Sequence, residues 1–212
     1  MAKPMARVGF IFECGRDGPD FKVCSHLLSR LNPNIEMVAR FLDNTEGLLA
    51  DCGPVARALL TQERCARVVV AWDLEPAWEK AKTPCRHDDK ERAFQSLRGA
   101  RVPLNRVLLL CIERELECWL MADNRALQAV IARYKHPHPV GRLPDFRRPD
   151  HQIGRPKTEL IRLFQRELGR TRKYVDRDHA LILARAIPDW SRLRRSDSFR
   201  RFAEKAACVR LP

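Results

Sequence analysis

Four apolar runs alternate with amphipathic segments in the first half of the chain, and this alternation constrains the fold more than any other feature. The apolar runs are ARVGFIF (6–12), NIEMVARFL (34–42), ARVVVAW (66–72) and NRVLLLCI (105–112). Helical patterns lie between them, at residues 20–31, 53–62 and 88–100. Such spacing is typical of βαβ units, whose parallel strands are buried on both faces. The sequence therefore predicts an α/β fold with a mainly parallel sheet flanked by helices.

The second half of the chain has a different pattern. Residues 115–134 read as one long helix, and a polar loop rich in proline, histidine and arginine follows from Lys135 to about Arg155. Three further helices are predicted, at residues 155–168, 178–187 and 196–207, with proline, aspartate or serine near their starts. We expect an α/β domain over residues 1–133 and a C-terminal helical extension over residues 134–212 that packs on it.

Positive charge is concentrated in the second half. The formal net charge is +13, but residues 1–104 carry 16 basic and 14 acidic side chains, whereas residues 105–212 carry 24 and 13. An excess of arginine in one half favours contact with nucleic acid over a merely solvated basic surface. The residues expected to contact phosphate groups are Arg170, Arg172, Lys173, Arg192, Arg194, Arg195, Arg200 and Arg201.

Acidic side chains follow three of the predicted strands at the point where each strand ends. They are Glu13 and Asp17 after the first strand, Asp73 and Glu75 after the third, and Glu113, Glu115 and Glu117 after the fourth. The carboxyl ends of parallel strands meet at one edge of a sheet, so these acids would repel one another unless cations offset them. Ligands that offer only oxygen suit Mg²⁺ or Mn²⁺. The pattern indicates a divalent metal site.

Each acid also has an ordinary interpretation. Asp17 or Asp20 fits an N-cap or a turn, Glu115 fits the favourable start of a helix, and Glu113 fits an exposed surface position. Glu13 and Asp73 are harder to explain in this way, because each directly follows the apolar core of a strand. These two residues are the strongest functional candidates.

Several of these motifs resemble a known family. Glu13 after the first strand, together with Asp73 and Glu75 at the end of the third, resembles the Toprim domain of topoisomerases, primases and overcoming-lysogenization-defect nucleases. IERELECWLMAD (112–123) is similar to the REFEAWLLAD-type signature of a bacterial Toprim-like family of unknown function. RPKTEL (155–160) and RLRRSDSFRRF (192–202) resemble that family's PK and terminal rSpSF motifs.

The resemblance implies metal-dependent phosphodiester chemistry. Glu13 would act as general acid or base and, with Asp73 and Glu75, would bind Mg²⁺ or Mn²⁺. Lys157 would steady a phosphate or the developing charge. Glu117 and Asp17 would complete the metal shell. Two positions depart from the usual pattern: Cys14 replaces the glycine after the first acid, and Glu75 replaces a shorter aspartate.

Two functions therefore remain open. One is a Toprim-type Mg²⁺-dependent nuclease acting on DNA or RNA, as the effector of a phage-defence or repair system with a separate ATPase partner. The other is a nucleic-acid-binding or ATPase-partner subunit that no longer cleaves. The chain has no GxxxxGK[ST] loop and no GxGxxG motif, so a nucleotide site of either type is not expected.

The remaining features are weaker. The eight cysteines follow no CxxC pattern or secreted framework, which favours a reducing, cytoplasmic setting, and no apolar run has the length of a membrane span. A structural zinc site at Cys85 and His87 is a minor alternative, because their spacing is poor. Trp78 is expected to pack rather than to stack on a base. The sequence leaves the oligomeric state open.

Overall fold

The computed structural model describes residues 6–75, 83, 85–135 and 137–211; Trp78 lies outside these residues. Its four strands are β1 (Ala6–Phe12), β2 (Ile35–Phe41), β3 (Arg67–Asp73) and β4 (Val107–Ile112). The α-helices are α1 (Pro19–Leu31), α2 (Thr45–Thr61), α3 (Arg86–Gly99), α4 (Glu117–Ala122), α5 (Asn124–Lys135), α6 (Pro149–Gln152), α7 (Pro156–Leu168), α8 (Asp176–Ala186) and α9 (Asp197–Arg201). Short 3₁₀ turns cover Leu104–Arg106 and Leu193–Arg195, and a π-helical turn covers Phe202–Ala206.

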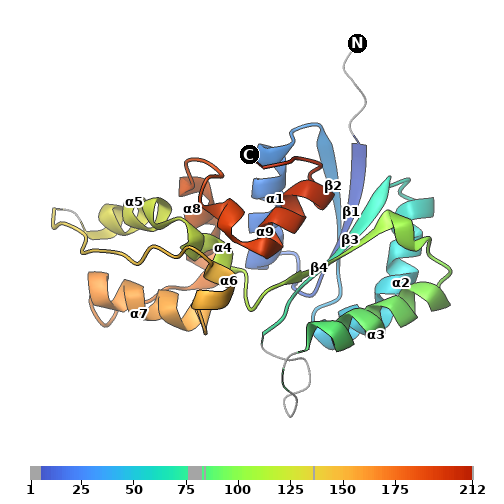
Figure 1. Cartoon of the computed structure of the whole chain (residues 1–212), viewed down its shortest axis with the longest axis horizontal. Helices are drawn as coiled ribbons and strands as arrows, with labels where there is room; N and C mark the ends of the chain where they lie inside the picture. The colour runs from blue at the N-terminus through green and yellow to red at the C-terminus, as the bar shows by residue number, and fades with distance from the viewer. Residues whose placement is uncertain (1–5, 76–82, 84, 136, 212) are drawn as a thin grey trace.

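The four strands form one parallel sheet in the order β2-β1-β3-β4 (Figure 1). The predicted α/β class with a parallel sheet is therefore confirmed. In this order the chain leaves β1 toward β2, then crosses back to β3 on the other side of β1. The carboxyl ends of β1 and β3 thus form the switch point of the sheet, where open α/β sheets bind their ligands.

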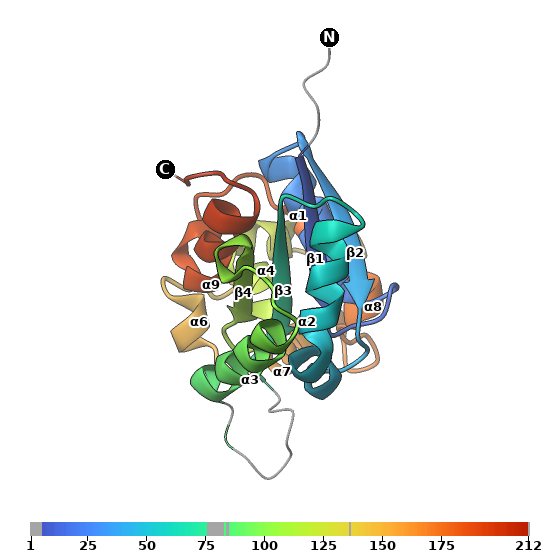
Figure 2. The same ribbon diagram turned by 90° about the vertical axis from the view of Figure 1, so that its right-hand side faces the viewer.

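Both faces of the sheet are covered, as continuous apolar strands require. Val8, Phe10 and Phe12 point into a large core that includes α1 and the helices from α4 onward. The alternate residues of the strands, Ile11 and Val70 among them, point into a second core under α2 and α3 (Figure 2). The C-terminal helices therefore pack on the α1 side of the sheet, and one hydrophobic cluster crosses the expected boundary at residue 133.

A close contact between α2 and α3 explains a proline inside α2. Pro54 has no N–H to donate to the carbonyl of Ala50, and the hydroxyl of Ser96 donates to that carbonyl instead, at 2.6 Å. The same hydroxyl accepts from the Gly53 N–H at 2.9 Å. A side chain at Gly53 would collide with the Ser96 backbone, its Cβ lying 2.1 Å from the carbonyl oxygen. Glycine lets the two helices touch.

Two motifs of the resemblance, at residues 112–123 and 192–202, meet inside the α1-side core. The indole Nε1 of Trp119 donates to the Ser198 hydroxyl at 2.8 Å, and the Ser198 N–H donates to Asp150 Oδ2 at 3.1 Å. Ser196 caps α9 by accepting from the Phe199 N–H at 3.1 Å, as its position before the helix predicts. These polar contacts join α4, α6 and α9 in a buried network.

Three helical predictions need correction. The predicted long helix over residues 115–134 is two helices, because Asp123 has an extended backbone and its buried carboxylate accepts from the Arg125 N–H. α2 begins eight residues before residue 53, since Asn44 caps it through the Gly47 N–H. The helix predicted to end at residue 207 changes to a π-helical turn after Arg201.

Within the residues that the structure describes, no helix is both long and apolar enough to cross a membrane.

Candidate metal centre

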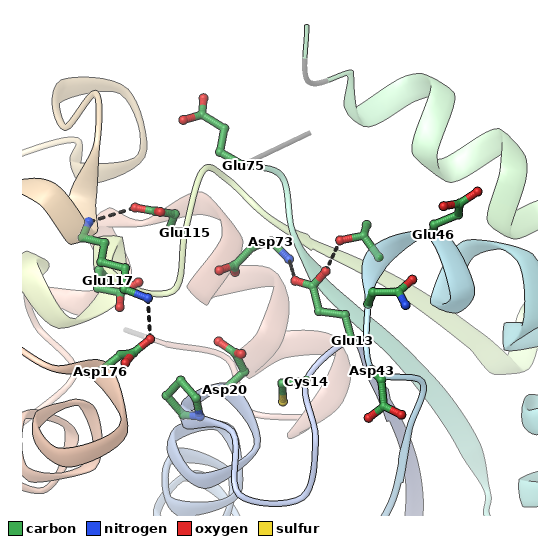
Figure 3. A pocket seen from close by; sticks show the side chains of 14 residues that line it. Glu13, Cys14, Asp20, Asp43, Glu46, Asp73, Glu75, Glu115, Glu117 and Asp176 are labelled. Carbon is green, nitrogen blue, oxygen red and sulfur yellow. Dashed lines mark hydrogen bonds and ion pairs between the residues drawn. The ribbon is translucent and has the colours of Figure 1, made fainter. Parts of the chain in front are cut away.

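A polar pocket opens at the carboxyl ends of the strands (Figure 3). Acidic side chains dominate its lining, and the sheet, α1, α2, α4, α7 and α8 all contribute to it. The pocket residues are Glu13, Cys14, Pro19, Asp20, Asp43, Asn44, Thr45, Glu46, Asp73, Glu75, Glu115, Glu117, Lys157 and Asp176. Of the predicted catalytic and metal-binding residues, all but Asp17 line it.

Glu13 and Asp73 meet at the switch point between β1 and β3. Oε1 of Glu13 accepts a hydrogen bond from the Asp73 N–H at 2.7 Å, and Oε2 accepts one from the Thr45 hydroxyl. Burial raises the pKa of Glu13 from 4.5 to about 7, although both hydrogen bonds oppose the change. Glu13 is therefore a fixed carboxyl group whose pKa suits proton transfer near neutral pH.

Asp73 carries the clearest sign of an unmet interaction. Its Oδ2 accepts from the Leu116 N–H at 3.3 Å, but its Oδ1 is buried and makes no hydrogen bond among the described residues. Burial raises the pKa of Asp73 well above its usual range, and the charges of Asp20, Glu13 and Glu117 raise it further. A buried carboxylate oxygen without a partner is costly, so this atom requires a cation or a proton.

Glu117 reaches the pocket from the first turn of α4. Only 6% of the residue is exposed, and its Oε1 accepts a hydrogen bond from the Tyr174 hydroxyl at 3.1 Å. Burial raises the pKa of Glu117 to about 7, and the charge of the nearby Glu115 adds to the effect. The sequence pointed to Glu117 but gave no sign of Tyr174, which lies 57 residues further along the chain.

The structure brings Asp20 into the pocket in place of Asp17. The Asp17 side chain is 95% exposed and lies 3.8 Å from the Lys22 ammonium group. Asp20, in the first turn of α1, lines the pocket instead, and burial raises its pKa, with Asp176 contributing repulsion. The signal available in the sequence was an acid at the start of the helix that directly follows β1.

Glu75 and Lys157 lie in the pocket but are held by other groups. Glu75 turns away from Asp73 and Glu13 in Figure 3, and its Oε1 accepts from Arg114 at 2.8 Å. Lys157 forms an ion pair with Asp176. Burial is the largest single influence on the pKa of Lys157 and lowers it. The hydrogen bond to Asp176 and the negative charges of Asp176, Glu117 and Glu115 together outweigh burial, so the pKa is raised and this lysine stays charged.

The surroundings of Cys14 disfavour a reactive thiolate. Burial raises the pKa of its thiol to about 12, and the charge of Asp20 contributes to the increase. The thiol donates to Asp20, and Gly18 lies so close to it that an added Cβ would be 2.6 Å from the sulfur. Cys14 therefore packs the turn between β1 and α1, and its raised pKa disfavours the thiolate that nucleophilic attack needs.

The donor set fits a hard divalent cation. The acids around Asp73 offer only oxygen, as Mg²⁺ and Mn²⁺ prefer, and Asp73 Oδ1 is a buried oxygen without a partner. As the described side chains stand, no three Asp, Glu, His or Cys residues converge into a complete metal site. An ion would therefore need a rotation of at least one acid, or water molecules as the remaining ligands, which Mg²⁺ commonly retains.

The predicted phosphate-contacting residues fall into two groups. Arg170, Arg172 and Lys173 are exposed in the turn that follows α7, although Arg172 donates to the Tyr134 carbonyl at 3.1 Å. The residues of the second group lie around the C-terminal turns, and each of them has a polar or electrostatic partner within the protein. They are Arg192, Arg194, Arg195, Arg200 and Arg201. The second group mainly binds other parts of the protein.

Comparison of the chain with protein-family models, with curated proteins and with solved structures gave no significant match. The candidate centre is therefore defined by its own geometry: the Glu13 carboxylate bound to the Asp73 N–H at the switch point, with Asp20 and Glu117 lining the same pocket.

Proposed function

We propose that this protein is a Mg²⁺- or Mn²⁺-dependent nuclease that hydrolyses phosphodiester bonds of DNA or RNA. The observation that carries the proposal is the Glu13–Asp73 pair, in which a buried carboxylate oxygen without a partner lies beside a carboxyl group whose pKa is about 7. The repulsion between such acids is relieved either by protonation or by a cation that binds between them, and a divalent ion is the relief that supplies chemistry. The resemblance to Toprim domains points to the same chemistry.

The proposed roles follow from the position of each side chain. Asp73, Asp20 and Glu117 would hold the ion, with Glu75 joining them if it leaves Arg114. A bound divalent ion would neutralise phosphate charge and lower the pKa of a coordinated water. Glu13 is held by Thr45 and by the Asp73 N–H, and it would take a proton from the attacking water. Lys157, kept charged by Asp176, would attract the phosphate.

A second candidate function is a nucleic-acid-binding or ATPase-partner subunit that does not cleave. One observation favours it: Glu75 pairs with Arg114, and no complete metal site is formed by the described side chains. Under the first proposal the protein would act in the cytoplasm, as the effector of a phage-defence or repair system with a separate ATPase partner. Under the second candidate function the protein would bind nucleic acid or an ATPase partner without cleaving.

Cleavage of labelled oligonucleotides separates the two candidates. Purified protein is incubated with single-stranded DNA, double-stranded DNA and RNA, each in Mg²⁺, Mn²⁺ or EDTA. We expect products with either metal, none in EDTA and none with the Glu13→Gln variant. Asp51→Asn, an exposed acid of α2, is the matched control and should cleave as wild type does. Binding without metal-dependent products from any substrate would favour the second candidate.

A further inference from the structure

A groove lined by arginines lies beside the acidic pocket, on the helical half of the protein. Its walls are α7 and the loop that runs between α5 and α7 in Figure 1. The groove has a volume of about 440 Å³ and is lined by Met121, Arg142, Leu143, Pro144, Phe146, Glu159, Arg162, Leu163 and Arg166. A second hollow, of about 800 Å³, continues on the α5 side of the same loop and shares residues 142–144.

The groove combines guanidinium groups with an apolar floor. Three arginines, Arg142, Arg162 and Arg166, face one glutamate, Glu159, among its lining residues. The Arg142 guanidinium contacts no carboxylate among the described residues, and Arg162 is 68% exposed despite its ion pair with Glu159. The lining therefore carries a positive excess that is available to an anionic ligand.

Nearby negative charges are already neutralised by the protein. Asp145, in the second hollow, accepts from Arg195 at 2.7 Å and lies 3.4 Å from Arg192. Glu167, on the buried side of α7, is bound by Lys135 at 2.8 Å and by Arg166 at 2.9 Å. These pairs keep the loop in place and prevent the two acids from repelling a polyanion.

The groove and the acidic pocket are built on the same two packed helices, α4 and α7, but they share no lining residue. On α4, Glu117 lines the pocket and Met121 lines the groove, four residues or about 6 Å further along the helix. On α7, Lys157 lines the pocket and Arg162 lines the groove, about 7.5 Å further on. Five residues also turn the helix, so Lys157 and Arg162 project about 140° apart from α7. A chain lying in the groove would therefore have to pass around the first turn of α7 to reach Lys157.

We propose that this groove binds a single-stranded segment of nucleic acid, whose continuation reaches the carboxylate pocket around the first turn of α7. Guanidinium groups would bind the phosphates, and the apolar floor, with the half-buried ring of Phe146, would receive bases. A duplex keeps its bases stacked inside and is too wide for a hollow of this size. The inference deepens the proposed nuclease function and rests on it for the choice of polyanion.

Binding in EDTA tests the groove separately from cleavage. Affinity of a fluorescent 20-mer of deoxythymidine is measured across a salt series for wild type and for the double variant Arg142→Gln/Arg162→Gln. We expect at least tenfold weaker binding and a salt slope smaller by about 1.4, the value for two lost contacts to a single strand. The matched control, Arg57→Gln/Arg101→Gln, removes two exposed arginines from the opposite side of the sheet and should bind as wild type does.

A third variant separates the contribution of the bases to binding from the contribution of the phosphate charges. Phe146→Leu should weaken binding several-fold without changing the salt slope, and thermal unfolding confirms that the variant is folded. Equal losses in the groove and control variants, or wild-type affinity in the groove variant, would overturn the proposal. Displacement of the oligonucleotide by polyglutamate at an equal concentration of charge would also overturn the proposal. Strong groove-dependent binding without metal-dependent cleavage would preserve this proposal and remove the proposed function.

Discussion

The carboxylate pocket and the arginine-rich C-terminal half differ in how their charges are satisfied. In the pocket, burial raises the pKa values of Glu13 and Glu117 to about 7, and neighbouring acids add repulsion. In the C-terminal half, many arginines outside the groove pair with nearby acids; Arg125, for example, binds both Asp123 and Asp189. Net charge alone is therefore a poor guide to the functional site. Charges left unsatisfied by the fold indicate the site better.

The largest expected effect tests whether the unsatisfied acids perform chemistry. We expect Asp73→Asn to reduce metal-dependent cleavage about 10²–10⁴-fold, because it removes charge at the buried oxygen that has no partner. Glu75→Gln should cost less than about tenfold, since this carboxylate already binds Arg114. Initial rates at saturating Mg²⁺ measure both. Equal losses in the two variants would mean that Glu75 turns inward when metal binds.

The next prediction concerns stability, and its sign follows from the raised pKa values. Folding favours the protonated forms of Glu13 and Glu117, so their contribution is greatest below pH 4.5 and is lost as pH rises toward 7. In EDTA, each group should lower the free energy of unfolding by up to about 3 kcal/mol between pH 4.5 and pH 8. Urea unfolding measures this change, and Mg²⁺ should reverse it at high pH.

Glu117→Gln serves as the control for this prediction, because the variant has no carboxylate to ionise at this position. The difference in unfolding free energy between wild type and variant should grow in the variant's favour as pH rises. A difference that does not change with pH would show that Glu117 stays ionised throughout, and the unmet charge in the pocket would then be smaller than the structure indicates.

A smaller effect distinguishes two acids that the sequence alone could not rank. Asp20→Asn should raise about tenfold the Mg²⁺ concentration needed for half-maximal cleavage or half-maximal thermal stabilisation, because Asp20 lines the pocket beside Asp73. Asp17→Asn should leave it unchanged, since that side chain is 95% exposed. Metal titrations of both variants provide the measurement. If Asp17→Asn weakened the response to Mg²⁺ and Asp20→Asn did not, the metal would lie outside the pocket, near the Gly15–Gly18 turn.

The sequence was sufficient for the strands and for the central acid pair, for a physical reason. A parallel sheet fixes where each strand ends, so Glu13 and Asp73 had to meet once the four apolar runs formed neighbouring strands. Asp20 and Tyr174 could not be ranked in the same way. Their positions depend on how α1 and the segment before α8 pack on the sheet, and no local pattern records that packing.

The helical half was less predictable, because its boundaries depend on single polar residues. Asp123 lies within an apolar periodicity that favours one continuous helix, yet its carboxylate binds Arg125 and ends α4. The roles of the arginines were equally hidden. Arg195 belongs to a basic run that resembles a phosphate-binding surface, but the structure pairs it with Asp145, 50 residues earlier.

The smallest predicted effect tests this structural role of the paired arginines. Arg195→Gln should destabilise the protein by about 1 kcal/mol, because it removes the contacts to Asp145 and to the Phe146 carbonyl from a partly buried site. Asp145→Asn should cost a similar amount, and the double variant little more, as expected for partners in one interaction. Urea unfolding of the three variants completes the cycle. Additive losses would mean that Arg195 acts independently of Asp145 and remains available to phosphate, and the contrast between satisfied arginines and unsatisfied acids would then not hold at this position.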